Sequence, residues 1–263
     1  MTEPTRSPIK DKPLRLPGQS LMEERAALWE NKLEPWALMA VFFIVLAGWE
    51  WFRYFRPMQP HPILVSACAL AVLGFAGWRL YRLRPRMRAL SQGIEGEKAV
   101  GQFLERLREQ NYQVFHDLIG ESFNVDHVLI GPAGAFTIET KTWSKPQRGD
   151  ARIAYDGDSL TVGGREPERD PIVQAKAQAH WLRALLREST GRHIDVQPVV
   201  VFPGWYVEAA PGAQRAVWVM EPKGLPAFLK NEPQRLTAED VRLAAYHLAR
   251  HVRSVERERL AQA

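Results

Sequence analysis

The chain of 263 residues is long enough for one sizeable soluble domain with additional elements, and it carries a formal net charge of +5. This basic balance, with a pI near 9.4, is compatible with a polyanionic partner or an anionic membrane surface, although arginines that flank membrane segments explain it equally well. The single cysteine, Cys68, excludes an intrachain disulfide, and its apolar surroundings favour a small buried hydrophobe over a nucleophile.

The N-terminal part of the chain predicts a tail followed by a pair of membrane helices. Residues 1–17 mix proline with basic and polar residues and are expected to be disordered. Residues 19–33 predict a helix that either lies on a membrane surface or extends the next helix. Two apolar runs, residues 36–49 and 63–78, are lengthened by flanking aromatic residues towards the span of a bilayer. We therefore expect a transmembrane hairpin over residues 35–82, with the lipid bilayer as a partner.

Basic residues predict the orientation of this hairpin. The loop between the two runs carries Arg53 and Arg56, whereas the second run is followed by Arg79, Arg82, Arg84, Arg86 and Arg88. The positive-inside rule then places both termini in the cytoplasm, and the first run begins too deep in the chain for a cleaved signal peptide. We expect a multi-pass protein of a bacterial inner (cytoplasmic) membrane, with a cytoplasmic tail and juxtamembrane helix over residues 1–34.

The composition from residue 91 onward is that of a soluble α/β domain. The expected elements are a helix at 95–110, a strand at 112–118, a hairpin within 123–143, a second hairpin at 151–155 and 159–162, a helix from Asp170 to about 189, strands at 196–202 and 215–220, and helices at 225–229 and 237–252. The apolar strand at 196–202 is expected to be central. We divide this part into a domain over residues 91–232 and a C-terminal helix within 233–263.

The hairpin within residues 123–143 predicts a cluster of charged groups. If Ile130 pairs with Ala135 across the turn at 131–134, Asp126 lies opposite Glu139 on one face, and Lys141 shares that face. Directly opposed carboxylates destabilise a sheet by roughly 0.2–1 kcal/mol, and a bound cation would offset this repulsion. A divalent metal such as Mg²⁺ fits these hard oxygen ligands, and a surface salt bridge to the lysine is the alternative.

Four motifs in this order resemble the nuclease-related domain (NERD) family of the PD-(D/E)XK nuclease superfamily. They are Gly93-Ile94-Glu95-Gly96-Glu97 at the start of a helix, Val125-Asp126-His127 and Ile138-Glu139-Thr140-Lys141 on two strands, and Pro171-Ile172-Val173-Gln174 at the start of a later helix. The resemblance covers about residues 91–229. It implies a restriction-endonuclease-like mixed sheet flanked by helices.

The resemblance also implies roles for individual residues. Asp126, Glu139 and Glu97 match the acids that bind Mg²⁺ or Mn²⁺, and Lys141 matches the lysine that orients water or offsets charge on phosphorus. Gln174 matches the glutamine of the later helix. From the residues alone, Gln178 shares the face of Gln174, and both are expected to contact the substrate or to support the ligands.

Two further side chains near the hairpin have open interpretations. Trp143 continues the face of Glu139 and either stacks on a base or covers the end of the hairpin. His127 follows Asp126, but strand alternation points it to the other face, so we interpret it as a packing residue.

The sequence thus predicts a membrane-anchored, metal-dependent nuclease that hydrolyses DNA phosphodiester bonds on the cytoplasmic side. RNA as the substrate and a homo-oligomeric state stay open. The alternatives are a catalytically inactive, membrane-tethered module that binds nucleic acid and a protein scaffold. The sequence contains no Walker loop, dinucleotide fingerprint or Cys/His zinc pattern.

Overall fold

The computed structural model describes residues 14–56, 61–120, 123–145, 152–164, 166–167 and 170–262. They divide into two compact units: one of residues 20–94, and one that joins the described residues up to Gln19 to those from Glu95 onward. In sequence, the first unit is therefore an insertion into the second. Each unit is described by itself below.

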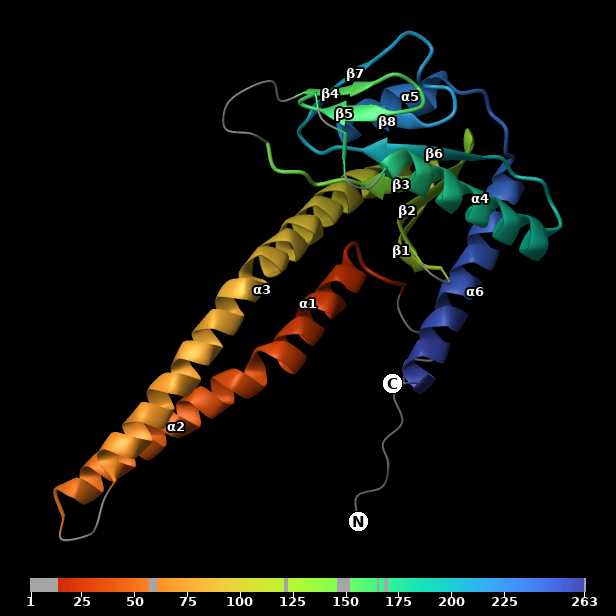
Figure 1. Ribbon diagram of the computed structural model, residues 1–263. Helices are drawn as coiled ribbons and strands as arrows, with labels where there is room; N and C mark the ends of the chain where they lie inside the picture. The colour runs from red at the N-terminus through yellow and green to blue at the C-terminus, as the bar shows by residue number, and fades with distance from the viewer. Residues whose placement is uncertain are drawn as a thin grey trace, which may run out of the picture. The chain divides into compact units, whose positions relative to one another are not determined.

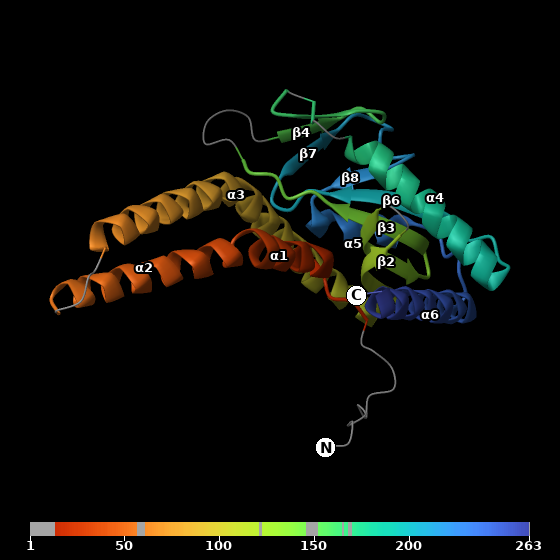
Figure 2. The same ribbon diagram turned by 60° about the horizontal axis from the view of Figure 1, so that its bottom comes forward.

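The unit of residues 20–94 is helical. It contains α1 (Gln19–Lys32), α2 (Glu34–Tyr54) and most of α3 (Pro62–Glu105), which confirms the predicted helices in this part of the chain. α2 and α3 lie side by side in both ribbon views (Figures 1 and 2). They are joined by a ring contact of 4.5 Å between the centroids of Trp36 and Phe75 and by a hydrogen bond of 3.2 Å from Trp51 Nε1 to Ser66 Oγ.

The apolar side chains of these helices point outward. Leu38, Val45 and Ile63 expose 63%, 65% and 80% of their surface, and Cys68 is exposed too, so the expectation that it is buried was wrong. The stretches Gln19–Tyr54 and Pro62–Gln110 are long and apolar enough to cross a membrane by length and composition. Of the most apolar 18 residues in each stretch, only 11% and 6% are buried, which argues against core helices of a soluble domain.

The helix predicted at residues 95–110 does not begin at Glu95. α3 is one continuous helix of 44 residues that includes Pro85, and residues Arg106–Gln110 form the short 3₁₀ helix η1 instead of α-helix. Most residues between the apolar run and Glu95 are arginine, leucine, methionine, alanine or glutamine, which favour helix, and the helix continues through Pro85 and Gly93, which are not adjacent and form no turn.

A five-stranded mixed sheet forms the centre of the second unit. Its strand order is β1-β2-β3-β6-β8, from β1 (Gln113–Ile119), β2 (Asn124–Gly131), β3 (Gly134–Thr140), β6 (Val196–Val201) and β8 (Trp218–Met220). β1, β2 and β3 are antiparallel neighbours, whereas β6 runs parallel to both β3 and β8. The predicted mixed α/β class and the internal position of β6 are confirmed, and β8 is shorter than predicted.

Helices cover both faces of this sheet. On one face, the last turns of α3 pack with η1 and α5 (Leu225–Asn231) through Val100, Leu104 and Leu225. On the other face, α4 (Pro171–Thr190) and α6 (Ala238–Gln262) pack through Leu182 and Leu248. The core therefore lies in two layers around β2, β3 and β6, which are buried along most of their length.

A second, three-stranded sheet has the order β5-β4-β7. The predicted hairpin around Asp156-Gly157 is confirmed as β4 (Arg152–Tyr155) and β5 (Leu160–Val162), but β7 (Tyr206–Ala209) was not predicted. β7 has only four residues, all partly or fully exposed, and it lacks the apolar alternation that marks a strand in sequence.

The predicted helix ends of α4 and α6 are confirmed by their caps. Asp170 accepts a hydrogen bond of 2.8 Å from the N–H of Ile172, and Gly191 ends α4 in the left-handed conformation with φ 68°. Thr237 and Asp240 form a reciprocal capping box at the start of α6. α6 runs to Gln262, ten residues further than predicted.

The described end of the predicted disordered tail is ordered. Leu14 packs on the apolar cluster under α4 and α6, and Arg15 exposes only 4% of its surface. The prediction was therefore wrong for residues 14–17, while residues 1–13 lie outside the described part of the chain. Composition suggested disorder because it contains no information on tertiary contacts, such as the buried acidic partners of Arg15 elsewhere in the fold.

Gly96 permits a close approach between α3 and the segment after β3. A Cβ atom at Gly96 would lie 1.7 Å from Thr142 Oγ1 and 2.8 Å from Thr142 Cβ. We expect Gly96→Ala to lower the free energy of unfolding by about 1–3 kcal/mol, because one of the two segments must move. Thermal unfolding of the detergent-solubilised chain measures this effect.

Gly77 is the matched control for this variant, since it lies in the same helix and a Cβ atom there would meet nothing within 4 Å. Gly77→Ala should leave stability unchanged or raise it slightly, because alanine favours helix over glycine. Equal melting temperatures for the Gly96→Ala and Gly77→Ala proteins would contradict the proposed tight contact.

Candidate acidic site

The candidate site lies where the β2–β3 ladder opens. The predicted register is confirmed, since Ile130 pairs with Ala135, and the ladder continues to His127 and Ile138. Beyond that pair, Asp126 Oδ2 accepts a hydrogen bond of 2.7 Å from the backbone N–H of Thr140. A side-chain carboxylate thus takes the place of a backbone acceptor at the end of the ladder. This opening brings the carboxylate of Asp126 to the end of β3.

Glu139 and Lys141 meet at this point, as the alternation of side chains along a strand predicts. The Lys141 ammonium lies 2.6 Å from Glu139 Oε1 and 3.0 Å from Gln174 Oε1. β3 is held on its other side by β6, where Glu139 pairs with Val200. Glu139 is 3% exposed, whereas the Lys141 side chain keeps 21% of its surface exposed. The lysine is therefore the part of this pair that solvent, or a ligand, can reach.

α4 contributes two glutamines one helical turn apart. Gln174 accepts the hydrogen bond from Lys141 and is partly exposed. Gln178 is only 1% exposed, and its Nε2 donates to Glu139 Oε2 at 2.5 Å and to the carbonyl of Asn124 at 2.9 Å. Of the two roles that the sequence leaves open for Gln178, its observed contact is the supporting one, because it bonds to the side of Glu139 that faces away from Lys141. Gln174 remains a candidate for substrate contact.

Trp143 lies over the end of the hairpin in the structure. Its ring is 5.0 Å from that of Phe202, its carbonyl accepts a hydrogen bond of 3.1 Å from Trp205 Nε1, and the residue is partly buried. Of the two interpretations left open by the sequence, the observed packing is that of a cover. Pro146, which follows in the loop, lies outside the described residues.

Glu97 belongs to the acidic cluster although α3 carries it. The pKa of its carboxyl is raised to about 8, mainly by burial and also by the charges of Asp117 and Glu139, while a hydrogen bond from the Gly18 backbone and the charge of Lys141 oppose the rise. Glu97 is 8% exposed. The close contact of Gly96 with Thr142 is what lets α3 bring Glu97 to the end of β3.

The pKa of the Asp126 carboxyl is also shifted by its neighbours in this cluster. Burial raises the pKa of its carboxyl well above the ordinary value, and the nearby charges of Glu139 and Glu97 act in the same direction. The N–H of Thr140 and the charge of Lys141 lower it. Three acids on three different elements therefore repel one another in a poorly solvated place, an arrangement that is common at functional sites.

A fourth acid, Asp117, was not singled out in the sequence. It is 2% exposed and has φ 50°, a left-handed conformation that is uncommon for a residue other than glycine. The β1–β2 ladder skips it between the pairs His116–His127 and Leu118–Val125. This local break lets Asp117 act on Glu97. A strand pattern alone cannot reveal it, because the break depends on backbone conformation.

The acids of the cluster outnumber its cations. Glu97, Asp117, Asp126 and Glu139 lie near Lys141 and Arg15, and Arg15 also pairs with Glu256. Burial and mutual repulsion therefore raise the pKa of Glu97 and of Asp126, which favours their protonated forms. A divalent cation would favour the ionised forms instead, and the carboxylates of Asp126 and Glu139 are the hard oxygen donors that Mg²⁺ and Mn²⁺ prefer.

The donor set suits some metal sites better than others. Among the described residues, no three His, Cys, Asp or Glu side chains are arranged as a ready-made metal cage. Mg²⁺ is commonly held by one or two carboxylates, with water and substrate phosphate completing its shell. The residues therefore fit an ion of that kind.

His127 is a packing residue, as predicted, but it has a partner that was not predicted. It is fully buried, and its Nδ1 lies 2.9 Å from Nδ1 of His116, whose Nε2 in turn lies 2.9 Å from Glu105 Oε1. Burial lowers the pKa of both imidazoles. The pair lies next to Asp117 and Asp126 in sequence.

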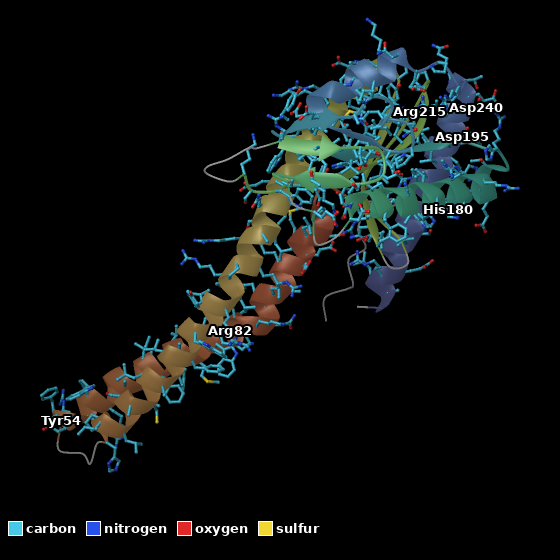
Figure 3. All side chains as sticks on the ribbon, turned by 45° about the horizontal axis from the view of Figure 1, so that its top comes forward. Tyr54, Arg82, His180, Asp195, Arg215 and Asp240 are labelled. Carbon is cyan, nitrogen blue, oxygen red and sulfur yellow. The ribbon has the colours of Figure 1, made fainter. Side chains whose placement is uncertain are left out.

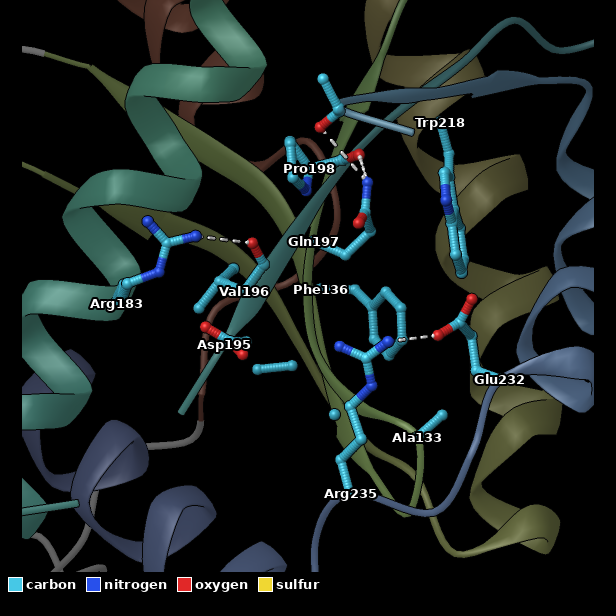
Figure 4. A pocket seen from close by; sticks show the side chains of 13 residues that line it. Ala133, Phe136, Arg183, Asp195, Val196, Gln197, Pro198, Trp218, Glu232 and Arg235 are labelled. Atoms are coloured by element: carbon cyan, nitrogen blue, oxygen red, sulfur yellow. Dashed lines mark hydrogen bonds and ion pairs between the residues drawn. The ribbon is translucent and has the colours of Figure 1, made fainter. Parts of the chain in front are cut away.

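A pocket of about 240 Å³ lies at the opposite end of β3 from Glu139 (Figure 4). Arg183 donates to the carbonyl of Val196 at 3.1 Å, and Arg235 pairs with Glu232 at 2.8 Å. Two arginines and two acids (Asp195 and Glu232) line it, so its charges balance and it does not continue the acidic cluster.

A mixed sheet whose central hairpin opens around two acids and a lysine, with helices on both faces, fits a nuclease-like domain. Residues 92–203 match the model of one protein family, the nuclease-related domain (NERD). This match contains Glu97, Asp126, Glu139 and Gln174, and it confirms the resemblance for that part of the chain. No curated protein and no solved structure matches the chain.

Proposed function

We propose that the chain is a metal-dependent nuclease that hydrolyses DNA phosphodiester bonds, with Asp126 and Glu139 as the metal ligands. The observation that carries the proposal is the meeting of Glu139, Lys141 and Gln174 beside Asp126 at the open end of the β2–β3 ladder, inside the region that matches a nuclease-related family. Bound there, Mg²⁺ or Mn²⁺ would supply a more acidic water and would stabilise charge on the phosphate.

The protein's own residues have distinct tasks in this proposal. Lys141 is the exposed cation, and it offsets the charge that develops on the phosphate oxygens or orients the attacking water. Gln174 holds the Lys141 ammonium from the side, and Gln178 fixes the orientation of Glu139. Glu97 supplies a third acid with a raised pKa, which suits it to support the metal or to hold a proton close to neutral pH.

We further propose that α2 and the first part of α3 anchor this nuclease in a membrane. Support comes from their length, their outward-facing apolar side chains and the small share of their most apolar residues that is buried. Aromatic side chains such as Tyr54, at the end of α2, suit the interface, and Arg82 belongs to the arginine-rich stretch that follows the second apolar run (Figure 3). By the positive-inside rule, the nuclease would act on the cytoplasmic side of a bacterial inner membrane.

The proposed activity is tested on the purified full-length chain in detergent. We expect cleavage of linear or circular double-stranded DNA with Mg²⁺ or Mn²⁺ and none with a chelator, and single-stranded DNA and RNA serve as competing substrates. Salt-sensitive DNA binding without cleavage in any divalent metal would replace the proposal by a tethered binding module. If the chain neither binds nor cleaves DNA, the interpretation as a protein scaffold is favoured.

A further inference from the structure

The described residues before α1, Leu14–Gly18, belong to the same compact unit as the candidate site, although the whole helical unit separates them from it in sequence. Leu14 anchors the segment in the apolar cluster on one face of the sheet. Pro17 contacts α3 so closely that a Cβ atom at Gly101 would lie 2.5 Å from Pro17 Cγ. The segment is therefore a fixed part of the unit at both of its ends.

Arg15 in this segment forms a buried ion network. Its Nε and Nη2 both lie 2.7 Å from Asp117 Oδ2, and its Nη1 lies 2.8 Å from Glu256 Oε2 of α6. Arg15 and Asp117 expose 4% and 2% of their surfaces. Charge-assisted bonds of this length in a poorly solvated place hold both side chains in one geometry.

Asp117 links this network to the acids of the site. Its left-handed backbone conformation is of the kind that persists only where the surroundings hold it, and Arg15 bonds directly to its carboxylate. The charge of Asp117 acts directly on Glu97. Arg15 holds the Asp117 carboxylate in position, so it also influences the electrostatic potential at the Glu97 carboxyl.

Gly18 makes a second link. Its backbone N–H donates a hydrogen bond to the Glu97 carboxylate. One short segment thus contacts two of the four acids, one through a side chain and one through the backbone. Neither contact is visible in the motifs of the sequence, because the segment lies far outside the region that matches the nuclease-related family.

We propose that Leu14–Gly18 completes the catalytic site, with Arg15 and Gly18 as positioning residues that hold Asp117 and Glu97 in place beside the proposed metal ligands Asp126 and Glu139. The inference rests on the proposed nuclease function. It also means that a fragment starting at residue 91 lacks part of its site, because the segment and the domain are separated by the helical insertion.

The test uses the full-length chain in detergent and two readouts: Mn²⁺ affinity by calorimetry without DNA, and kcat and KM for DNA cleavage. Arg15→Gln is expected to weaken Mn²⁺ binding about 10- to 100-fold and to lower kcat to a similar extent, the range typical for groups that support metal ligands. KM should change less than kcat. Arg15→Lys should recover part of both losses, because it restores the charge but not the planar donor geometry.

Glu256→Gln is the matched control, because it removes the other partner of Arg15 and leaves the bonds to Asp117 in place. It should keep Mn²⁺ affinity and kcat close to the parent values. If Arg15→Gln does not fold, the double variant Arg15→Gln/Asp117→Asn decides, since it leaves neither charge unpaired in the buried site. We expect the double variant to fold and to lose kcat at least about 10-fold.

Two results overturn the inference in different ways. Parent-like Mn²⁺ affinity and kcat in folded Arg15→Gln, or in the double variant, would show that the segment is only structural, while the nuclease proposal stands. A parent chain that neither binds Mn²⁺ nor cleaves DNA would remove the proposed function and this inference with it.

Discussion

Glu139→Gln and Lys141→Met should each lower metal-dependent DNA cleavage by at least about 100-fold. Glu139→Gln removes a metal-binding charge while keeping the shape that Gln178 contacts, and Lys141→Met removes the exposed cation while keeping most of the aliphatic stem. The two variants should differ in metal binding. Glu139→Gln should weaken Mn²⁺ affinity, whereas Lys141→Met should leave it unchanged or strengthen it, because a competing positive charge is gone.

The controls for this pair come from the same unit. Glu208 on β7 and Lys176 on α4 are exposed residues of the same types, so Glu208→Gln and Lys176→Met should cleave at the parent rate. The measurement is the initial rate of plasmid and linear DNA cleavage with Mg²⁺, Mn²⁺ or chelator. Parent-like rates in Glu139→Gln would show that the cluster is a structural salt bridge.

Glu97→Gln should stabilise the fold at alkaline pH. The folded-state pKa of Glu97 is about 8 against an ordinary value of 4.5, so the folded state binds the extra proton between these pH values. This contribution to stability is present below pH 4.5 and is lost as the pH rises through 8. Above pH 8 the parent holds a buried, repelled charge, and the neutral variant should be more stable by about 2–5 kcal/mol.

Thermal unfolding of both full-length proteins from pH 5 to pH 9 measures this difference, and each kcal/mol corresponds to about 2–4 °C in Tm. The gap should close towards pH 5, where the parent carboxyl is protonated in the fold. Glu95→Gln is the control, since Glu95 is the exposed acid one position before Gly96, and it should show no such dependence. Mg²⁺ should narrow the gap at pH 9 by stabilising the charged parent. A constant gap across the pH range would contradict the clustered position of Glu97.

The β2–β3 hairpin was predicted in part from the sequence. Period-two alternation and a glycine–proline turn predicted the register of Ile130 with Ala135, and the same alternation placed Glu139 and Lys141 on one face, where they form an ion pair. The pattern did not predict that the ladder ends after His127. A regular ladder would have set Asp126 directly opposite Glu139, whereas the open ladder turns its carboxylate to the N–H of Thr140.

Long-range contacts decided features that the sequence left open or did not predict. The sequence placed Gln178 on the same helical face as Gln174 without choosing between substrate contact and support, and the packing of α4 against β3 buries it against Glu139. β7 is too short and too exposed to carry a strand pattern, and it exists because β4 offers it a parallel edge. Local periodicity contains no information about either neighbour.

The sequence by itself determined the helices of the N-terminal part, the mixed α/β class, the hairpin and its register, and the acids and lysine that share one face. These features follow from local periodicity, caps and turns, which act over a few neighbouring residues. Only the tertiary structure decided that α3 brings Glu97 to β3, that Asp117 joins the acids, and that Arg15 reaches Asp117. Those contacts join segments that are distant in the chain, so they arise from how the buried faces pack and where buried charges find partners.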